Sequence, residues 1–345
     1  MPSPFRVGIT ADFLKADGSL GFGDIGLETL SENPQIYYEY LPPCGAELPA
    51  KIADRFDALL VLAPRVTAAT VEQCRRLTLV ARFGVGYDTV DVGACTRNNV
   101  LLTITPSGVR RPVAVSALAM LLALSHKLLA KDRLTRAGRW HEKLDYVGSG
   151  LTGRTLGLIG LGNIGREILR VTSPLEMNAV AYDPFVSAEA ARASGATLLS
   201  LDDVLRQADF VCICCALTSQ THHLLDAQRL ALMKPSAFLI NVARGPIVDQ
   251  AALTRVLQER RIAGAALDVF EQEPIAVDDP LLQLENVIVS PHAICWTDEL
   301  FRGNGQAACR SILDVAAGRT PAEVVNREVL NQPGMIEKLA RFITQ

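Results

Sequence analysis

The chain has 345 residues, of which 49% are apolar, so it is long enough to bury the cores of two domains. Its formal net charge is −3 and its sequence holds no block of like charges, which argues against nucleic acid and anionic membranes as partners. Residues 1–10 lack the long apolar stretch and small-residue cleavage site of a secretory signal, and we therefore expect a cytoplasmic location.

Apolar stretches of strand length alternate with amphipathic stretches of helix length along most of the chain, as in parallel sheets wound by helices. The predicted fold class is therefore α/β. In the first third, one small sheet is expected from strands at residues 6–10, 35–40, 58–62, 79–83 and 100–103.

A long helical pattern covers residues 112–129 and opens with Pro112, a residue suited to the first position of a helix. Ser116, Ser125, His126 and Lys127 interrupt its apolar run. We expect this stretch to be too short and too polar to cross a bilayer.

A second sheet is predicted from residue 155 onward, with helices between its strands. Six strands are enough for a complete dinucleotide-binding sheet. A last helix at about 297–317 should lead to a short polar tail, where the chain returns to its first domain. The six expected strands are 155–159, 178–182, 210–215, 238–241, 264–267 and 287–289.

The eight cysteines do not predict disulfides or a metal site. Five of them stand singly and fit free thiols in a reducing compartment. The other three, Cys212, Cys214 and Cys215, fall in the expected strand 210–215, where residues three apart point to opposite faces, so we interpret them as buried strand cysteines. The five single cysteines are Cys44, Cys74, Cys95, Cys295 and Cys309.

The segment GLGNIG follows the expected strand 155–159 and opens a helical stretch, which is the context that a dinucleotide-binding turn requires. Gly160 would allow the tight turn, Gly162 the approach of a pyrophosphate, and Gly165 close packing of helix on strand. The helix N-terminus would then face the phosphates.

Asp183 follows the next strand at the distance expected for a carboxylate that accepts hydrogen bonds from the adenosine ribose. Such a carboxylate would repel a 2′-phosphate, and Pro184 and Phe185 follow it rather than an arginine. This favours NAD over NADP. The alternative is that Asp183 and Pro184 only begin a turn.

Three further residues follow strands of the same sheet and suit the reduction of a 2-oxo acid, which needs a cation for the carboxylate and carbonyl and an acid for the developing alkoxide. Arg244 could grip the carboxylate, and His292 could carry the proton. Glu273 could hydrogen-bond the imidazole and favour its cationic form. Taken alone, each could be a solvated or structural residue, and spacing does not show that they converge.

These motifs together resemble the D-isomer-specific 2-hydroxyacid dehydrogenase family, which includes phosphoglycerate dehydrogenases and glyoxylate/hydroxypyruvate reductases. The match runs in order through RFGVGYDTVDV, LTGRTLGLIGLGNIG, NVARGPIVD, AALDVFEQEP and SPHA. The resemblance implies two doubly wound parallel-sheet domains: a flavodoxin-like catalytic domain of residues 1–106 plus 299–345, and a Rossmann NAD-binding domain of residues 107–298. It also implies a homodimer and D stereochemistry.

The resemblance implies roles for individual residues. Arg244, Glu273 and His292 would be catalytic, with Arg244 and His292 also binding substrate, and the backbone of Val85 and Gly86 would face the substrate carboxylate. NAD would be bound by Gly160, Gly162, Asn163, Ile164, Gly165, Asp183, Cys215, Ala216, Thr221, Val242, Ala243 and Asp268.

The chain departs from the family pattern at several places. A frequent His-x-Pro-Leu-Thr run beside the adenine is replaced from Cys214 onward, and the glycines common after the catalytic histidine are replaced by residues 293–295. Trp296 could then shape the substrate pocket. Arg110 and Arg111 could receive a second anionic group of the substrate, or form a solvated pair.

Two other functions stay open at this point. One is an NAD-sensing binding protein on the same scaffold, against which the complete set of Arg244, Glu273 and His292 argues. The other is oxidation of a different small anion, as in phosphite or formate dehydrogenases. Formate dehydrogenases resemble this layout but carry glutamine where Glu273 stands.

The remaining histidines are interpreted as structural or surface residues. They are His126, His141, His222 and His223.

Overall fold

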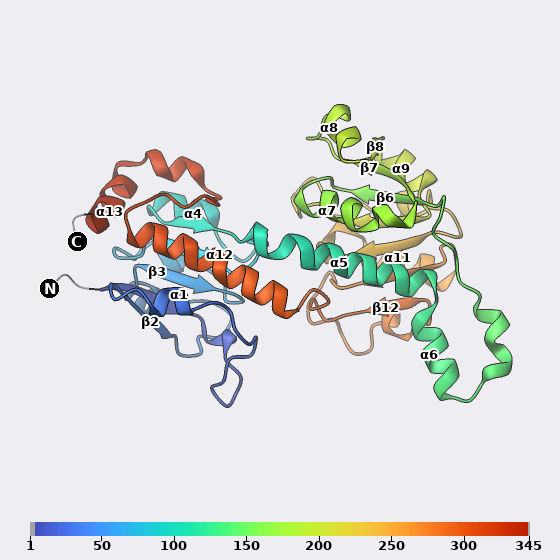
Figure 1. Cartoon of the computed structure of the whole chain (residues 1–345), viewed down its shortest axis with the longest axis horizontal. Coiled ribbons are helices and arrows are strands. Elements are labelled where there is room, and N and C mark those ends of the chain that lie inside the picture. The colour runs from blue at the N-terminus through green and yellow to red at the C-terminus, as the bar shows by residue number, and fades with distance from the viewer. Residues whose placement is uncertain (1–3, 344–345) are drawn as a thin grey trace. The chain divides into compact units, whose positions relative to one another are not determined.

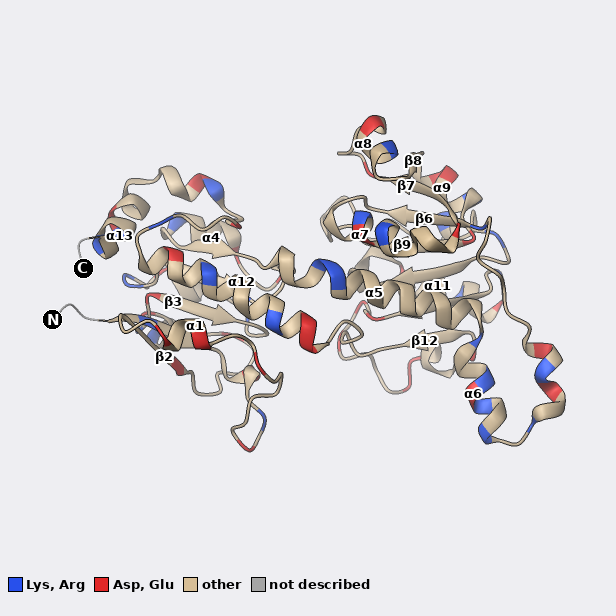
Figure 2. Cartoon of the chain, in the orientation of Figure 1, with Lys and Arg blue, Asp and Glu red and all other residues tan. Residues whose placement is uncertain are grey.

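The computed structural model describes residues 4–343, which form two compact units (Figure 1). Unit 1 comprises Met1–Val109 and Trp296–Gln345, and unit 2 comprises Arg110–Cys295. The sequence places the two boundaries after residue 106 and before residue 299. Residues 1–3 and 344–345 of the expected first domain lie outside the described part. Charged side chains of both signs are distributed over both units (Figure 2).

Unit 1 is built on a parallel sheet of five strands in the order β2-β1-β3-β4-β5. Both faces of the sheet are covered. Leu59 and Val80 lie in one core cluster with Phe56 and Leu48, while their neighbours Leu60 and Leu79 are also fully buried. Burial on both faces explains the continuous apolar stretches in the sequence. The strands are β1 (Phe5–Ile9), β2 (Ile36–Tyr40), β3 (Ala58–Val61), β4 (Leu79–Arg82) and β5 (Leu101–Thr103).

The helices of unit 1 are mostly short, apart from α12 (Asp298–Ala316) and α13 (Pro333–Ile343). The hydroxyl of Thr297 caps α12 by accepting a hydrogen bond from the N–H of Leu300. The shorter helices are α1 (Glu28–Ser31), α2 (Ala50–Ala53), α3 (Ala68–Val71) and α4 (Val92–Arg97), with the 3-10 helices η1 (Ala11–Phe13) and η6 (Arg327–Asn331).

The prediction of a polar tail after α12 was wrong, because α13 follows. Met335 of this helix is fully buried, and Nζ of Lys338 donates to the backbone oxygens of Leu77, Asn98 and Asn99. Burial lowers the pKa of Lys338 to about 8. The segment looks polar in the sequence because only one of its sides is packed.

Unit 2 contains a parallel sheet of seven strands in the order β12-β11-β10-β9-β6-β7-β8. The chain builds outward from β6 in one direction and then from β9 in the other, so the strand order reverses between these two strands. In open α/β sheets, ligands bind at the carboxyl ends of the strands beside such a reversal. The strands are β6 (Thr155–Ile159), β7 (Asn178–Tyr182), β8 (Thr197–Leu198), β9 (Phe210–Ile213), β10 (Phe238–Asn241), β11 (Gly264–Leu267) and β12 (Val287–Val289).

Helices cover this sheet on both sides, and separate core clusters lie on its two faces. In β9, Val211 and Ile213 belong to one cluster and Phe210 and Cys212 to the other, as the alternation of a strand requires. The helices are α5 (Pro106–Ser125), α6 (Leu128–Arg136), α7 (Asn163–Thr172), α8 (Ala188–Ala193), α9 (Leu201–Gln207), α10 (Ala227–Leu230) and α11 (Gln250–Gln258), with η2 (Trp140–Tyr146), η3 (Ser173–Leu175), η4 (Gly245–Ile247) and η5 (Pro280–Gln283).

The α/β class and the two doubly wound parallel sheets are confirmed, but three details of the sequence prediction were wrong. The short strand β8 was missed because two residues carry no alternation. Strand β9 ends at Ile213, so Cys214 and Cys215 lie in the loop after it. The long helix starts at Pro106, and Pro112 lies inside it at the expense of one helical hydrogen bond.

Helix α5 is long and apolar enough, by length and composition alone, to cross a membrane, contrary to the sequence estimate. Ala114, Ala117 and Leu121 are nevertheless buried in the unit 2 core, and half of the helix's apolar window is buried. This is the packing of a core helix in a folded domain.

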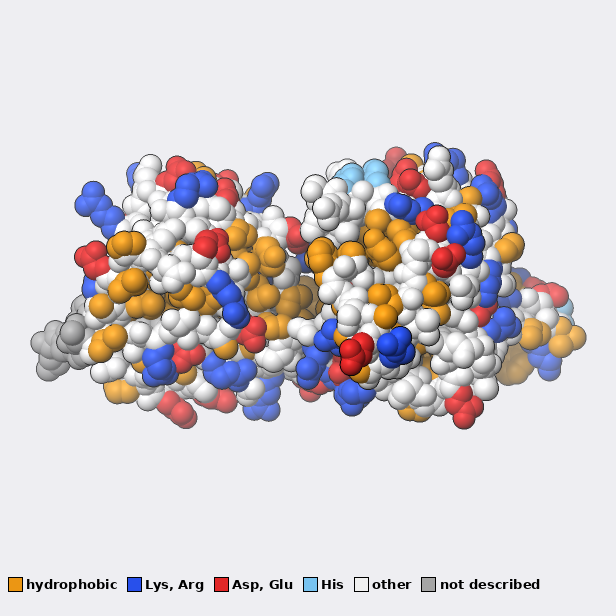
Figure 3. Space-filling view, turned by 90° about the horizontal axis from the view of Figure 1, so that it is seen from above, with side chains coloured by type: hydrophobic (Ala, Val, Ile, Leu, Met, Phe, Trp, Pro, Cys, Tyr) orange, Lys and Arg blue, Asp and Glu red, His pale blue; other side chains and the backbone are white. Residues whose placement is uncertain are grey.

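On the surface, apolar side chains also gather in patches on both units (Figure 3).

The contact between α12 and residue 25 predicts a strong stability effect in unit 1. A Cβ at Gly305 would lie 1.7 Å from the backbone oxygen of Ile25, whereas one at Gly150 would meet nothing within 4 Å. We expect Gly305→Ala to lower the free energy of unfolding by about 1–3 kcal/mol through overpacking, measured by urea denaturation. Gly150→Ala is the control, and equal stability of the two variants would contradict the packing described.

Candidate active site

A tight glycine turn joins β6 to α7 beside the reversal of strand order. Gly160 has φ +101°, and a Cβ on it would lie 2.7 Å from the backbone nitrogen of Cys215. Such a backbone conformation favours glycine. A Cβ on Gly165 would lie 2.5 Å from the oxygen of Gly160, so its absence lets α7 pack against the turn. At Gly162, apart from the adjoining backbone, no atom of the described residues lies within 4 Å of a Cβ position, which leaves this backbone open to a ligand.

The N-terminus of α7 is open as well. Gly162 is the N-cap residue, and among the described residues no side chain caps the first turn, which begins with Asn163 and Ile164. Free N–H groups at the positive end of a helix form a binding site for anions. The turn and the helix end together fit the pyrophosphate of a dinucleotide.

Asp183 lies directly after β7, next to the glycine turn. One of its carboxylate oxygens accepts a hydrogen bond from the N–H of Leu161 (2.8 Å), and the other accepts one from Phe185 (2.9 Å). Each carboxylate oxygen has a second lone pair. The carboxylate is therefore held in place and can still accept hydrogen bonds from ribose hydroxyls.

The loop after β9 lies against the same turn. The thiol of Cys214 donates to the backbone oxygen of Gly160 (3.0 Å), and Thr221 Oγ1 donates to the oxygen of Ala216 (2.7 Å). Burial raises the pKa of Cys215 to about 11 and that of Cys212 to about 12. These thiols stay protonated at neutral pH, which suits a packing role better than redox chemistry.

The three residues predicted to be catalytic follow three neighbouring strands. Arg244 comes after β10, Glu273 after β11 and His292 after β12, and these strands lie side by side in the sheet. Because the strands are parallel, the loops that follow them meet at one edge. The structure thus places the three residues in neighbouring loops, which their spacing in the sequence alone did not show.

Nδ1 of His292 lies 2.7 Å from Oε2 of Glu273, and Oε1 of Glu273 accepts a hydrogen bond from the N–H of Phe270. Burial favours the neutral form of Glu273, but its bonds to His292 and Phe270 and the charge of Arg244 outweigh burial and lower its pKa. The carboxylate is therefore ionised at neutral pH. The two side chains are 44% and 37% exposed, so a small molecule can reach the imidazole.

His292 is held by its backbone as well as by its side chain. Its φ of +55° is unusual for a residue with a Cβ, and its N–H donates to the backbone oxygen of Asp268 (2.8 Å). The Asp268 carboxylate, which is 3% exposed, accepts the N–H groups of Ala293 and Ile294, both at 3.0 Å. Asp268 thereby fixes the loop that carries the histidine.

Asn241, which sequence analysis missed, organises the Arg244 loop. It is 1% exposed, its amide nitrogen donates to the oxygen of Arg244 (3.0 Å), and its amide oxygen accepts the N–H of Ala243 (3.0 Å). Val242 lies between them. The signal was present in the asparagine that ends an otherwise apolar strand.

Val85 and Gly86 belong to unit 1, in the loop after β4. The preceding Gly84 donates its N–H to Thr105 Oγ1 (2.8 Å), and the hydroxyl of Thr105 donates to Oδ1 of Asn304 (2.8 Å). Thr105 and Asn304 are 1% and 2% exposed. No sequence motif singles out either residue, because they are 199 residues apart in the chain.

Arg110 and Arg111 both lie near the buried Glu167 of α7, at 3.9 Å and 3.2 Å. The two side chains are 57% and 42% exposed, so they are solvated, as in one of the two sequence interpretations, and they also pair with Glu167 within unit 2. Trp296, 51% exposed, packs on aromatic side chains of unit 1.

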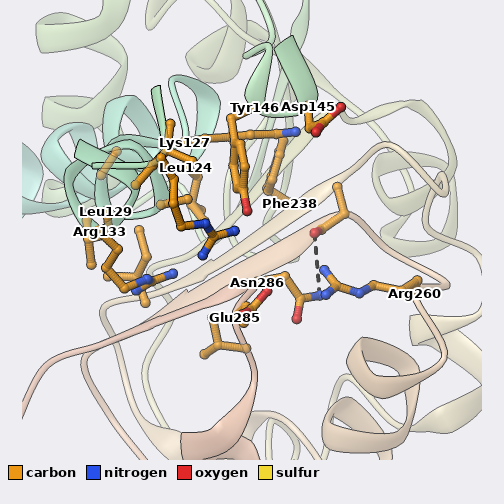
Figure 4. A pocket seen from close by; sticks show the side chains of 17 residues that line it. Leu124, Lys127, Leu129, Arg133, Asp145, Tyr146, Phe238, Arg260, Glu285 and Asn286 are labelled. Carbon is orange, nitrogen blue, oxygen red and sulfur yellow. Dashed lines mark hydrogen bonds between the residues drawn. The ribbon is translucent and has the colours of Figure 1, made fainter. Parts of the chain in front are cut away.

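A cavity of about 510 Å³ lies at the amino ends of the unit 2 strands, where β10 and β12 begin (Figure 4). Phe238 and Asn286 line it together with Lys127, Arg133 and Tyr146 (Figure 4). Arg244, Glu273 and His292 are not among its lining residues. The catalytic candidates instead follow the carboxyl ends of these strands.

The fold and the glycine turn define a dinucleotide-binding dehydrogenase. Residues 118–293 match the family model of the D-isomer specific 2-hydroxyacid dehydrogenase, NAD binding domain. The chain belongs to this family of NAD-dependent oxidoreductases, as the sequence motifs predicted.

Individual relatives agree with this assignment. The chain is 36% identical to a glyoxylate reductase of Thermococcus onnurineus over 82% of this chain and 87% of the relative. It is 34% identical to a D-3-phosphoglycerate dehydrogenase of Archaeoglobus fulgidus, over 84% of this chain and 55% of the relative. The structure of a 2-hydroxyacid dehydrogenase from Ketogulonicigenium vulgare superimposes with a TM-score of 0.78 at 28% identity, covering 94% of this chain and 99% of that one. Similar identities to enzymes with different names leave the substrate open.

The Glu167 cluster predicts a pH-dependent contribution to stability. Hydrogen bonding from Arg170, opposed by burial and supported by Arg111 and Arg110, lowers the pKa of Glu167 from 4.5 to about 2. A lowered pKa stabilises the fold above pH 4.5, and this contribution is lost as the pH falls toward 2. We expect Glu167→Gln to cost about 1–2 kcal/mol at neutral pH, allowing for screening of the exposed arginines.

The measurement is urea denaturation at pH 7 and at about pH 3, where the difference from wild type should shrink. Glu189→Gln, at an exposed position of α8, serves as the control. A difference that is unchanged or larger in acid would contradict the assignment.

Proposed function

We propose that the protein reduces a 2-oxo acid to a D-2-hydroxy acid with NADH, and catalyses the reverse reaction with NAD. The observation that carries the proposal is the 2.7 Å contact between His292 and Glu273 beside the Arg244 loop. An acid, its orienting carboxylate and a guanidinium meet the needs of this reaction.

Bound NADH would supply the hydride that reaches C2 of the oxo acid. Arg244 would hold the substrate carboxylate and polarise the carbonyl oxygen. The imidazolium of His292 would donate its Nε2 proton to that oxygen as negative charge develops. Glu273, ionised at neutral pH, would hold Nδ1 and stabilise the imidazolium. One hydride and one proton thus convert the carbonyl to an alcohol.

The cofactor would lie along the carboxyl edge of the unit 2 sheet. The open end of α7 supports binding of the pyrophosphate by Gly160, Gly162, Asn163, Ile164 and Gly165. Asp183 would bind the ribose hydroxyls and repel a 2′-phosphate, which favours NAD over NADP. Cys215, Ala216 and Thr221 would lie beside the adenosine, and Val242, Ala243 and Asp268 beside the nicotinamide.

The backbone of Val85 and Gly86 would bind the substrate carboxylate. The support is the buried link from Gly84 through Thr105 to Asn304, which fixes the start of this loop in unit 1. A fixed backbone loses little freedom when a ligand binds.

The catalytic roles predict different defects for two substitutions. We expect His292→Ala to lower kcat about 100- to 10,000-fold by removing the proton donor, with NADH binding retained. Arg244→Ala should also raise KM for the oxo acid. Arg319→Ala, in unit 1, is the control.

The measurements are NADH oxidation with glyoxylate, hydroxypyruvate, pyruvate, phosphohydroxypyruvate and longer 2-oxo acids, and fluorescence titration of NADH. Undiminished activity of His292→Ala would remove it from the mechanism. If wild type binds NADH but turns over none of these acids, the alternative of an NAD-sensing protein is favoured.

We also propose that the chain forms a cytoplasmic homodimer through the segment between α5 and β6. This segment exposes an unusual density of apolar side chains, as protein–protein interfaces do. They are Leu128, Trp140, Leu144 and Val147, which are 58–77% exposed. We expect light scattering to give twice the chain mass of 37.2 kDa, and the double variant Trp140→Ser, Leu144→Ser to give one chain mass. A monomeric wild type, or a dimeric double variant, would contradict this. Val277→Ser, at another exposed apolar position, is the control.

A further inference from the structure

Five aromatic side chains form a continuous cluster at the carboxyl end of the unit 1 sheet. Phe13 lies in η1, directly after β1, and Phe83 directly follows β4. Their rings meet edge to face with centroids 5.0 Å apart. Phe22, Phe301 and Trp296 complete the cluster. The carboxyl ends of parallel strands are where open α/β sheets bind ligands.

The cluster runs from a buried base to an exposed face. Phe13, Phe83 and Phe301 are 0%, 2% and 8% exposed, whereas Trp296 is 51% exposed and Phe22 is half-buried. We call the surface of Phe22 and Trp296 the aromatic face. Its rings lie 5.3 Å apart, and Phe301 supports both, at 4.5 Å from Phe22 and 5.7 Å from Trp296.

The segment after β1 is folded so that it presents Phe22. Leu14 and Leu20 pair in an antiparallel bridge, and the N–H of Gly21 donates to the oxygen of Phe13 (2.8 Å). This small hairpin returns the chain to the cluster. Phe22 is therefore placed by backbone hydrogen bonds and by ring packing.

The aromatic face is continuous with the loop proposed to bind the substrate carboxylate. Phe83 directly precedes Gly84, which Thr105 holds in place, and the Phe83 ring packs on Phe301.

We propose that the aromatic face binds the side chain of the substrate, and that the preferred substrate is a 2-oxo acid with a branched aliphatic or aromatic side chain. This inference rests on the proposed function and narrows its substrate. Glyoxylate, which has no side chain, would leave the face unused.

A phosphorylated side chain fits the face poorly. Three carboxylates lie close to the two aromatic residues in the chain: Asp24 follows Phe22 by two residues, and Asp298 and Glu299 follow Trp296. Arg302, next to Phe301, pairs with Asp24 at 3.1 Å. A phosphate would have to separate that pair while lying against apolar rings. Removing a phosphate from water at this apolar surface, without new hydrogen-bond partners, is unfavourable.

The test compares kcat/KM with NADH for glyoxylate, 4-methyl-2-oxopentanoate, phenylpyruvate and phosphohydroxypyruvate. We expect wild type to prefer one of the two apolar acids over glyoxylate by at least about tenfold, and Trp296→Ala and Phe22→Ala to reduce that ratio about 10- to 100-fold. Trp296→Phe should retain most of it. Tyr37→Ala, an exposed aromatic position on β2, is the control.

The ratio of two substrates on one preparation does not depend on the fraction of folded enzyme, so partial misfolding cannot produce the expected result. A wild type that prefers glyoxylate or the phosphorylated acid would overturn this inference and leave the proposed function standing. Equal losses on both substrates in the variants would also overturn it, since the face would then support the fold. Failure to reduce any 2-oxo acid would instead refute the proposed function.

Discussion

The hydrogen bond between His292 and Glu273 joins two loops that are 19 residues apart in the chain, and the geometry of the candidate site depends on it. It forms because β11 and β12 pair in parallel, so that both loops leave the sheet at the same edge. The carboxylate of Asp268 then fixes the turn after His292, and the N–H of Phe270 fixes Glu273. Arg244, from the neighbouring strand, adds positive charge that helps to keep Glu273 ionised.

The glycine turn and the catalytic candidates follow different strands of the same sheet. The glycine turn after β6 lies at the reversal of strand order, whereas Arg244, Glu273 and His292 follow the strands on one side of it. A dinucleotide laid along the carboxyl edge would extend from the first group to the second. Family membership and the open end of α7 both support the cofactor end.

The sequence predicted much of this because the relevant signals are local. The central strands of both sheets are buried on both faces and appear as apolar stretches, and GLGNIG carries its own strand and helix context. Other features depend on contacts between distant residues. Asn304 bonds to Thr105 across 199 residues, and Lys338 of α13 donates to the backbone oxygen of Leu77, far earlier in the chain. Pro112 was misplaced for the opposite reason, since its local preference for a first turn is overridden by the helix that starts at Pro106.

The central claim is that this site moves a hydride to C2 of a 2-oxo acid and a proton to its oxygen, giving the D product. The most direct measurement uses NADH deuterated at both C4 positions with 4-methyl-2-oxopentanoate or pyruvate, followed by mass spectrometry and chiral chromatography of the product. We expect a D-2-hydroxy acid with one deuterium at C2. A product without deuterium at C2, or of L configuration, would contradict it.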